Sequence, residues 1–286
     1  MDYYYRKGTD LIGLRMLPLE TGYTSTTVNW AQMENEGVEV ALTTRNIHTK
    51  DFTWFTNLNF GYNDNTVLRE TVAENAIKPS REGYSVGAIF AYKTAGLDDE
   101  GYPLFLTQDG RKVTATEFFK LNNAGASTLS AEEQRNLYSY IGSTEPKVSG
   151  GFMNTFKYKR VTLGINCIFN FGMYVQTTPT YDPTNYDRGL NSNRDILNRW
   201  TPDHTNTTLP KLMTENDGRT GEYLRYKEQN LFRELDIWVK KQNYFRFESI
   251  RLGYELPEKW LKPVGIKSAS VSLEGRNLWV IASNYH

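Results

Sequence analysis

Two neighbouring stretches of the chain alternate apolar and polar side chains with the period of a β-strand. In Val161–Met173 every odd position is apolar, and the even positions are small or polar except for Ile168. Lys147–Lys159 alternates in the same way, and Asn154 is the one polar residue on its apolar face. Successive side chains of a strand point to opposite faces, so each stretch predicts a strand with one apolar face and one polar, solvated face. Val161–Met173 is long enough to cross a bilayer at a tilt, and the pair predicts a hairpin of a transmembrane β-barrel.

Five further stretches show the same alternation. In one of them, Asn243–Leu256, the phase slips, because Phe247 shares the parity of Phe245 while Ile250 takes the other parity. We therefore expect a β-bulge near Glu248–Ser249. With the first hairpin, about seven barrel strands are predicted, the further ones at Asp2–Arg6, Gly37–Arg45, Asp51–Asn63, Asn243–Leu256 and Ile266–Trp279.

The connections between these strands alternate between short and very long. In an up-and-down sheet successive connections fall at opposite ends, so all the short ones lie at one end and all the long ones at the other. Outer-membrane barrels have this asymmetry, with short periplasmic turns and long extracellular loops. The short connections are Asn46–Lys50, Tyr158–Arg160 and Pro257–Gly265, and the long ones are Gly8–Met33, Asp64–Pro146 and Tyr174–Gln242.

The long loops contain local patterns of their own. Val86–Lys93 and Tyr102–Thr107 have the composition of short strands. Ser130 followed by Glu133 fits a capping box at the start of a helix. Loops of this length are uncommon in compact domains and usually carry function. Short helices are predicted at Thr116–Asn122, Ser130–Ile141 and Asn193–Trp200.

Composition narrows the class of protein. The 286 residues have a mean hydropathy of −0.59 and contain no apolar run long enough for a transmembrane helix. The 33 basic and 33 acidic residues balance, so no charge pattern points to nucleic acid. The single Cys167 excludes an intrachain disulfide and a cysteine-based metal site. The amino terminus lacks the apolar segment of a signal peptide, and together with the end of the chain this predicts an internal or truncated fragment.

The strongest motifs resemble a known family. Tyr244–Pro257 (YFRFESIRLGYELP), Trp260–Leu261 with Gly265–Ile266, and Gly275–Trp279 (GRNLW) closely resemble the C-terminal barrel region of SusC/RagA-type TonB-dependent transporters. The remaining similar stretches, which extend the resemblance over nearly the whole chain, are Asn35–Glu39, Ala95–Asp98, Gly101–Phe105 and Arg199–Pro202.

This resemblance implies the fold and the partners. The fold is all-β, an antiparallel transmembrane β-barrel present in part, with long extracellular loops that carry short helices. Residues 1–286 would be the C-terminal part of the barrel, without the plug domain, the signal peptide and the final strands, since such transporters have 22 strands. The family implies import of glycans or peptides through the outer membrane of Bacteroidetes-type bacteria. It also implies a SusD-like surface lipoprotein and coupling to TonB-ExbB-ExbD through the missing N-terminal portion.

Candidate binding residues follow from the expected position of each segment. Aromatic rings can stack on a sugar while amides meet its hydroxyl groups, although any one of these residues can instead pack the loops. Glu39, Arg45, Glu274 and Arg276 are expected to face the lumen, where they line the transport path or pair with one another or with a plug. The loop candidates for substrate binding are Tyr84, Tyr102, Tyr181, Tyr186, Asn191 and Trp200.

Metal binding and catalysis have weak support. Asp98, Asp99 and Glu100 precede Gly101 and supply oxygen ligands for Ca²⁺, but exposed acidic turns are usually only solvated. No other cofactor is expected. The histidines His48, His204 and His286 have no carboxylate or nucleophile at a catalytic spacing, so an enzyme is not expected.

Two other classes of protein remain open. A passive porin or structural outer-membrane barrel would share the alternation and the loop asymmetry. A secreted all-β enzyme or carbohydrate-binding protein would instead pack its apolar stripes against a second sheet.

Overall fold

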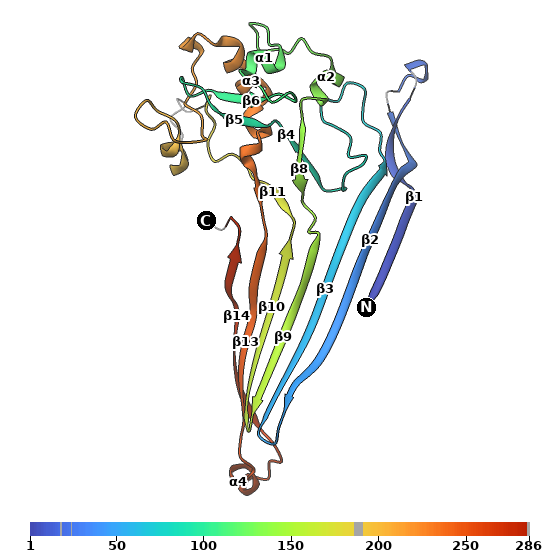
Figure 1. The fold of residues 1–286 in the computed structure, drawn as a ribbon, viewed down its shortest axis with the longest axis vertical. Coiled ribbons are helices and arrows are strands. Elements are labelled where there is room, and N and C mark those ends of the chain that lie inside the picture. Colours follow the sequence, from blue (N-terminus) through green and yellow to red (C-terminus); the bar gives the residue numbers. More distant parts are fainter. Residues whose placement is uncertain (18, 24, 186–190, 285–286) are drawn as a thin grey trace.

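Seven antiparallel strands form one long, twisted sheet (Figure 1). The computed structural model describes residues 1–17, 19–23, 25–185 and 191–284. Neighbouring strands in the sheet follow the order β1-β2-β3-β9-β10-β13-β14, so each strand pairs with the next barrel strand along the chain. The predicted seven strands are confirmed, with bounds β1 Asp2–Met16, β2 Ser25–His48, β3 Phe52–Arg69, β9 Val148–Tyr158, β10 Val161–Phe171, β13 Tyr244–Glu255 and β14 Ser270–Ala282.

The register of the sheet aligns the apolar side chains into rows that cross it. Cys167 of β10 stands opposite Phe152 of β9 and Phe247 of β13. A residue shares a face with the residue directly opposite it, so apolar positions on separate strands merge into one continuous face. The row through Cys167 continues from Phe152 to Leu58 of β3 and Leu42 of β2. Two further rows on this face are Trp54, Phe156, Leu163, Leu252 and Leu273; and Tyr158, Val161, Tyr254 and Val271.

This apolar face is not covered by a second layer of described residues. Val271 and Leu273 are 63% and 77% exposed, and Leu252 is half exposed. In water such a face would be a strong aggregation hazard, and a soluble β-sandwich would bury it. The structure therefore argues against the secreted all-β alternative.

A bulge keeps the apolar pattern of β13 on one face. Across the β10 ladder, Asn166 pairs with Ser249 and Cys167 pairs with Phe247, so Glu248 is the extra residue. On its other side, Asn277 and Leu278 of β14 stand opposite Glu248, and Asn277 has the left-handed φ of 52° that a bulge often requires. The bulge near Glu248–Ser249 is confirmed, and it reconciles the two parities of the sequence.

The short connections lie together at one end of the sheet and the long segments at the other (Figure 1). One predicted long loop, Gly8–Met33, is wrong, because β1 continues to Met16 and β2 begins at Ser25. The extension is a two-stranded ribbon whose register shifts between Gly8 and Ile12. A hairpin in water can satisfy its backbone hydrogen bonds without an apolar face, so alternation did not reveal it.

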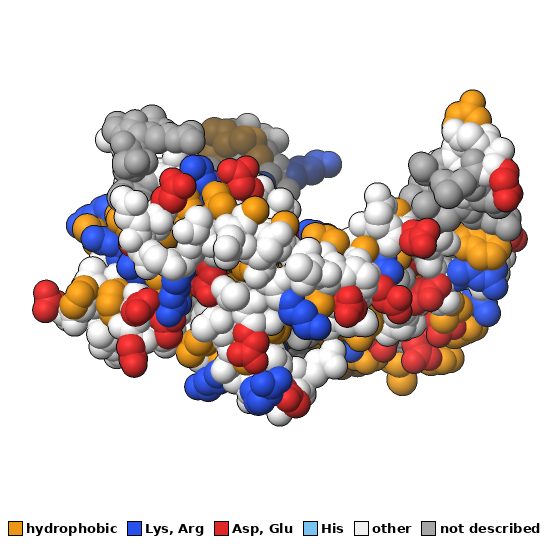
Figure 2. Space-filling view, turned by 90° about the horizontal axis from the view of Figure 1, so that it is seen from above, with side chains coloured by type: hydrophobic (Ala, Val, Ile, Leu, Met, Phe, Trp, Pro, Cys, Tyr) orange, Lys and Arg blue, Asp and Glu red, His pale blue; other side chains and the backbone are white. Residues whose placement is uncertain are grey.

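Most of the long segments fold into an ordered layer at that end, which we call the cap. Its buried side chains include Tyr92, Phe105 and Phe119, and they form the principal hydrophobic core of the described residues. The cap strands are β4 Ala88–Ala91, β5 Thr94–Leu97, β6 Pro103–Leu106, β7 Lys112–Val113, β8 Ser139–Ser143, β11 Tyr174–Gln176 and β12 Val239–Lys241. Seen from above, side chains of both charges are spread over its surface (Figure 2).

The helices are short, as expected for loops, but their bounds differ from the prediction. The segment Ser130–Ile141 is helical only over Ala131–Arg135, with the expected capping box, and then forms β8 by pairing with β4. No described helix is long and apolar enough to span a membrane. The α-helices are α1 Ala115–Phe119, α2 Ala131–Arg135, α3 Thr220–Gln229 and α4 Glu258–Leu261. The 3₁₀-helices are η1 Leu19–Thr21, η2 Arg194–Asn198, η3 Glu215–Asp217, η4 Leu231–Glu234, η5 Asp236–Trp238 and η6 Lys262–Val264.

Candidate functional site

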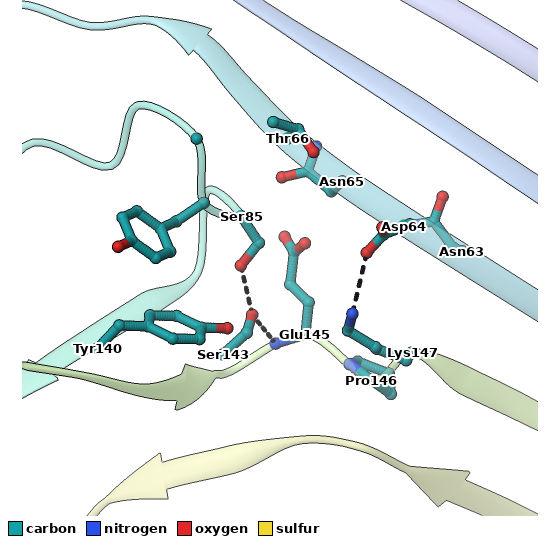
Figure 3. A pocket seen from close by; sticks show the side chains of 12 residues that line it. Asn63, Asp64, Asn65, Thr66, Ser85, Tyr140, Ser143, Glu145, Pro146 and Lys147 are labelled. Atoms are coloured by element: carbon teal, nitrogen blue, oxygen red, sulfur yellow. Dashed lines mark hydrogen bonds and ion pairs between the residues drawn. The ribbon is translucent and has the colours of Figure 1, made fainter.

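A cavity of about 230 Å³ opens where β3 parts from β9 at the cap end of the sheet (Figure 3). The Asn63 N–H still donates to the carbonyl of Lys147, but the next bond from this edge of β3 runs from Val67 N–H to the carbonyl of Tyr84. The segment that carries Tyr84 is held in place by Asn65, whose Oδ1 accepts from Val86 N–H at 2.7 Å. We call this opening, bounded by residues 63–66, 83–85, 140, 143 and 145–147, the rim cavity.

Aromatic rings form one wall of the rim cavity. Tyr84 and Tyr140 stack with their ring centroids 4.7 Å apart and an interplanar angle of 29°. Phe90 meets Tyr84 edge-on at 5.2 Å and supports the pair. Both tyrosines remain 40% exposed, so the stack presents apolar ring surface to the solvent. Such a wall suits the flat apolar face of a sugar ring or an aromatic or aliphatic side chain.

Polar groups form the rest of the cavity lining. The Ser85 hydroxyl donates to the Ser143 hydroxyl at 2.6 Å, and Lys147 Nζ lies 3.2 Å from Asp64 Oδ1. The hydrogen bond that Lys147 donates to Asp64 raises the pKa of Lys147, and burial raises the pKa of Tyr140, so both keep their protons at neutral pH. The half-buried carboxylate of Glu145 points into the cavity with no hydrogen-bond or ion-pair partner among the described residues. This unpaired acceptor is available to hydroxyl or N–H donors of a ligand.

A second cavity, of about 460 Å³, lies on the polar face of the sheet between β9 and β14. Arg251 is one of its charged residues and donates to the Ser272 hydroxyl at 3.3 Å. The predicted lumen residues share this face, with Glu39 opposite Gly61 and Arg45 opposite Phe55. Glu274 pairs with Arg276 at 2.9 Å. The small and polar lining residues include Thr155, Thr162, Gly164, Asn166, Ser249, Gly253, Ser270, Ser272 and Glu274.

Of the predicted loop candidates that the structure describes, only Tyr84 lines the rim cavity. Tyr102 and Tyr181 are buried in the cap, where their hydroxyls donate to Asp217 Oδ2 at 2.9 Å and to the Pro210 carbonyl at 3.0 Å. No ring face of these two tyrosines is open to a ligand. The ring of Trp200 packs against Gly101, so closely that a Cβ there would lie 2.5 Å from it.

Asn191 is exposed away from the residues that line the rim cavity, and Tyr186 lies outside the described residues. The sequence does not indicate Tyr140 and Glu145, because it predicts a helix over Ser130–Ile141 and a loop from there to Pro146. The signal was present, since Tyr140 and Ile141 favour strands and Pro146 ends the segment before β9.

The acidic turn predicted as a weak calcium site has other partners. Asp98 Oδ2 lies 2.6 Å from Arg219 Nη1, and its other oxygen accepts from the N–H groups of Glu100 and Tyr102. A cation there would compete with the guanidinium for the same carboxylate. Among the described residues no group of three or more His, Cys, Asp or Glu side chains is placed to hold a metal. The calcium site stays a prediction.

A partly buried ion-pair network beside this turn links Lys211 to Asp217 and Arg219 to Asp98. Burial alone would raise the pKa of Asp217, but hydrogen bonds from Thr214, Lys211 and Tyr102 outweigh it and hold that pKa well below its usual range. Burial, with the hydrogen bond to Asp217, raises the pKa of Tyr102. The Arg219 guanidinium lies 4.4 Å from the Tyr102 ring centroid. The network links two cap segments that are distant in sequence, residues 98–102 and 211–219.

We expect the Asp217 network to make the cap acid-sensitive. Because the pKa of Asp217 is depressed in the folded state, Asp217 contributes fully to the stability of the cap above the ordinary aspartate pKa of about 4. That contribution is lost as the pH falls toward the pKa of the folded state. Asp217→Asn should raise amide hydrogen exchange over residues 211–222 about tenfold at pH 7, and should flatten the acid dependence that remains after correction for intrinsic exchange. Asp109→Asn, in an exposed turn of the same cap, should leave residues 211–222 unchanged. Equal exchange in the two variants would contradict this role.

The sequence and the structure both have named relatives. Over 298 residues the chain is 26% identical to TonB-dependent receptor P3 of Formosa agariphila. This match covers 97% of this chain and 27% of that receptor. It is 21% identical to TonB-dependent receptor SusC of Bacteroides thetaiotaomicron, over 91% of this chain and 24% of SusC. No protein-family model matches the sequence.

Solved structures of a peptide transporter share the fold of this chain. A chain from the structure of the RagAB peptide transporter matches 99% of this chain with a TM-score of 0.71 and 23% sequence identity, over 29% of its own length. The RagAB importer in its open-open state matches with a TM-score of 0.72 and 22% identity. The chain thus spans about a quarter of the length of the curated relatives it matches, and the fold is that of part of a TonB-dependent barrel.

Proposed function

We propose that this chain, a homologue of part of the SusC/RagA-type TonB-dependent receptors, forms part of the wall and the extracellular loops of an outer-membrane importer. The observation that carries the proposal is the uncovered apolar face, which runs in register across six strands from β2 to β14 and backs onto a polar face. Outer-membrane barrels place lipid and water on these two faces. The names of the relatives, which are receptors and transporters rather than enzymes, support the same assignment.

In this proposal the chain acts within a longer receptor. The remaining strands close the barrel, and a plug domain inside it answers to the TonB-ExbB-ExbD system from the periplasm. A SusD-like surface lipoprotein covers the cap and delivers an oligosaccharide or a peptide. The rim cavity, with its Tyr84–Tyr140 stack and the free Glu145 carboxylate, takes part in binding that substrate at the extracellular end.

Energy-dependent uptake tests this function. The full-length receptor in its own bacterium should accumulate a labelled oligosaccharide or peptide, and a protonophore that collapses the proton gradient should abolish the accumulation. Loss of the receptor gene should do the same. Uptake that follows the external concentration and ignores the protonophore would instead identify a passive porin.

The contribution of the rim cavity is tested by three substitutions. Tyr84→Ala, Tyr140→Ala and Glu145→Gln should each weaken substrate binding by about tenfold, which corresponds to the roughly 1.4 kcal/mol expected for one stacking or charge-assisted contact. Binding would be measured by titration calorimetry on the purified receptor. Leu197→Ala, which changes an exposed apolar residue elsewhere in the cap, should bind normally. Unchanged affinity in all three cavity variants would remove the rim cavity from the binding site.

A further inference from the structure

The end of the sheet opposite the cap has an excess of positive charge. The connections β2–β3, β9–β10 and β13–β14 with their flanking positions, residues 48–51, 157–160 and 255–267, contain seven Lys or Arg and three Asp or Glu. Because the whole chain is neutral, the remainder is correspondingly acidic. We call this end the basic rim; its cations are Lys50, Lys157, Lys159, Arg160, Lys259, Lys262 and Lys267.

Few of these charges are neutralised within the chain. Lys157 pairs with Glu255 at 2.7 Å, and Lys262 lies 3.7 Å from Glu258. Lys50, Lys259 and Lys267 are exposed and make no ion pair in the part of the chain that the structure describes. The basic rim therefore presents a surplus of free cations to whatever lies beside it.

Large apolar side chains lie among these cations. In the β13–β14 corner, Trp260 is 59% exposed, Val264 67% and Ile266 47%, while Leu261 is buried and anchors the corner. Exposure of three such side chains in one short corner is unfavourable in water, since each would gain from transfer to an apolar environment.

The apolar face of the sheet reaches the same end. Its last row contains Tyr158, Val161, Tyr254 and Val271, all of which are exposed. Lys159 Nζ lies 5.4 Å from the Tyr158 ring centroid, so a cation and an interfacial aromatic residue are neighbours here. Apolar surface, aromatic residues and free cations thus follow one another along the sheet, in the order met at the boundary between hydrocarbon and lipid headgroups.

We propose that the basic rim binds the anionic headgroups of phospholipids in the leaflet at the short-turn end of the barrel, while Trp260 enters that leaflet at headgroup depth. This inference rests on the proposed function, because it requires the apolar face to lie in a membrane. The continuity between the rim and the lipid face favours a lipid surface over a soluble acidic protein. Phosphatidylglycerol, with one negative charge, is the simplest probe of this chemistry.

Lipid-selective quenching of Trp260 tests the proposal. The full-length receptor would be reconstituted into phosphatidylcholine vesicles that contain equal fractions of either brominated phosphatidylglycerol or brominated phosphatidylcholine. Subtracting the signal of Trp260→Phe isolates the fluorescence of Trp260. At low ionic strength we expect at least twofold stronger quenching by the brominated phosphatidylglycerol, and we expect high salt to reduce the difference.

Matched triple variants locate the selectivity. In the variant that carries Lys259→Gln, Lys262→Gln and Lys267→Gln, both brominated lipids should quench Trp260 equally. Lys93→Gln/Lys112→Gln/Lys240→Gln, which removes three exposed lysines of the cap, should keep the preference of the unmodified receptor. Equal quenching by both lipids in the unmodified receptor would overturn the proposal. Absence of quenching would also overturn it, and would favour a periplasmic protein as the partner of the corner.

Heat-modifiable migration on gels, measured on the same vesicles, separates this inference from the proposed function. A receptor that inserts and shows the shift but has no lipid preference contradicts the basic rim alone. A receptor that never inserts contradicts the membrane assignment, and the rim proposal fails with it.

Discussion

Replacing Ile250 with arginine should lower the unfolding free energy of the full-length receptor in a lipid bilayer by about 2–4 kcal/mol, the cost of a cation on the lipid face near the midplane. Ile250 stands opposite Ile165 of β10 and Gly275 of β14, in the middle rows of the apolar face. An arginine there has no partner on the neighbouring strands and is too far from either end to reach the headgroups. The measurement is urea unfolding of the receptor in vesicles, followed by tryptophan fluorescence.

The opposite face of the same sheet provides the control. Ser272 lines the cavity on the polar face, so Ser272→Arg places the same charge where water is available. It should cost well under 1 kcal/mol, as is usual for exposed substitutions. Tyr254→Arg, in the last row of the apolar face, tests the dependence on depth and should cost less than Ile250→Arg. Equal costs at all three positions would show that the apolar face does not lie in lipid.

The seven strands could be predicted from the sequence because each has one face toward an apolar environment and the other toward water. Where a strand lies between these two solvents, its side chains must alternate, as in Val161–Phe171. Where β2 and β3 continue beyond that region, both faces meet water or the cap, and the alternation that marks a strand is lost. Alternation therefore predicts a loop over Gly8–Met33, although its residues from Ser25 onward pair with neighbouring strands.

The cap could not be predicted in the same way, because its core joins residues that are far apart in sequence. Tyr92 stacks on Tyr138 at 4.1 Å, and Phe105 stacks on Phe118 at 4.9 Å. No local period indicates such contacts, so Tyr102 and Tyr181 were expected to be available to substrate when they are buried. Helix α3 has a low apolar content and buries Glu222 and Arg225, which explains why no helical pattern was visible.

The rim cavity lies between these two cases. Tyr84 was identified from its residue type alone, whereas Tyr140 and Glu145 reach the cavity only because β8 pairs with β4 and redirects the chain toward β9. A polar, aromatic segment that becomes a strand only by pairing with a distant segment has no sequence signature of its own. Site residues contributed by such segments require the structure.

One family-like motif, Asn35–Glu39, has a steric explanation in the sheet. The Tyr4 side chain of β1 crosses over β2 at Gly37, and its hydroxyl donates to Asn63 Oδ1 of β3 at 2.8 Å. A Cβ on Gly37 would lie 2.5 Å from the Tyr4 hydroxyl and 2.3 Å from the carbonyl oxygen of Tyr62. Glycine inside a strand often marks such a close approach. Three strands are thereby fastened by one tyrosine that only a glycine can accommodate.

Gly37→Ala should therefore destabilise the full-length receptor by about 1–3 kcal/mol, the usual cost of forcing an extra methyl group into a packed site. The backbone oxygen of Tyr62 cannot rotate away from the new methyl group. Adding Tyr4→Ala to the Gly37→Ala variant, which removes the ring, should therefore restore only part of the lost stability. Gly61→Ala is the matched control, because Gly61 lies on the same face of the adjacent strand and its nearest neighbours, the Ser149 oxygens, would be 3.7 Å from a new Cβ. Urea unfolding in vesicles gives both values, and equal stability of the two variants would show that Tyr4 does not cross the sheet at Gly37.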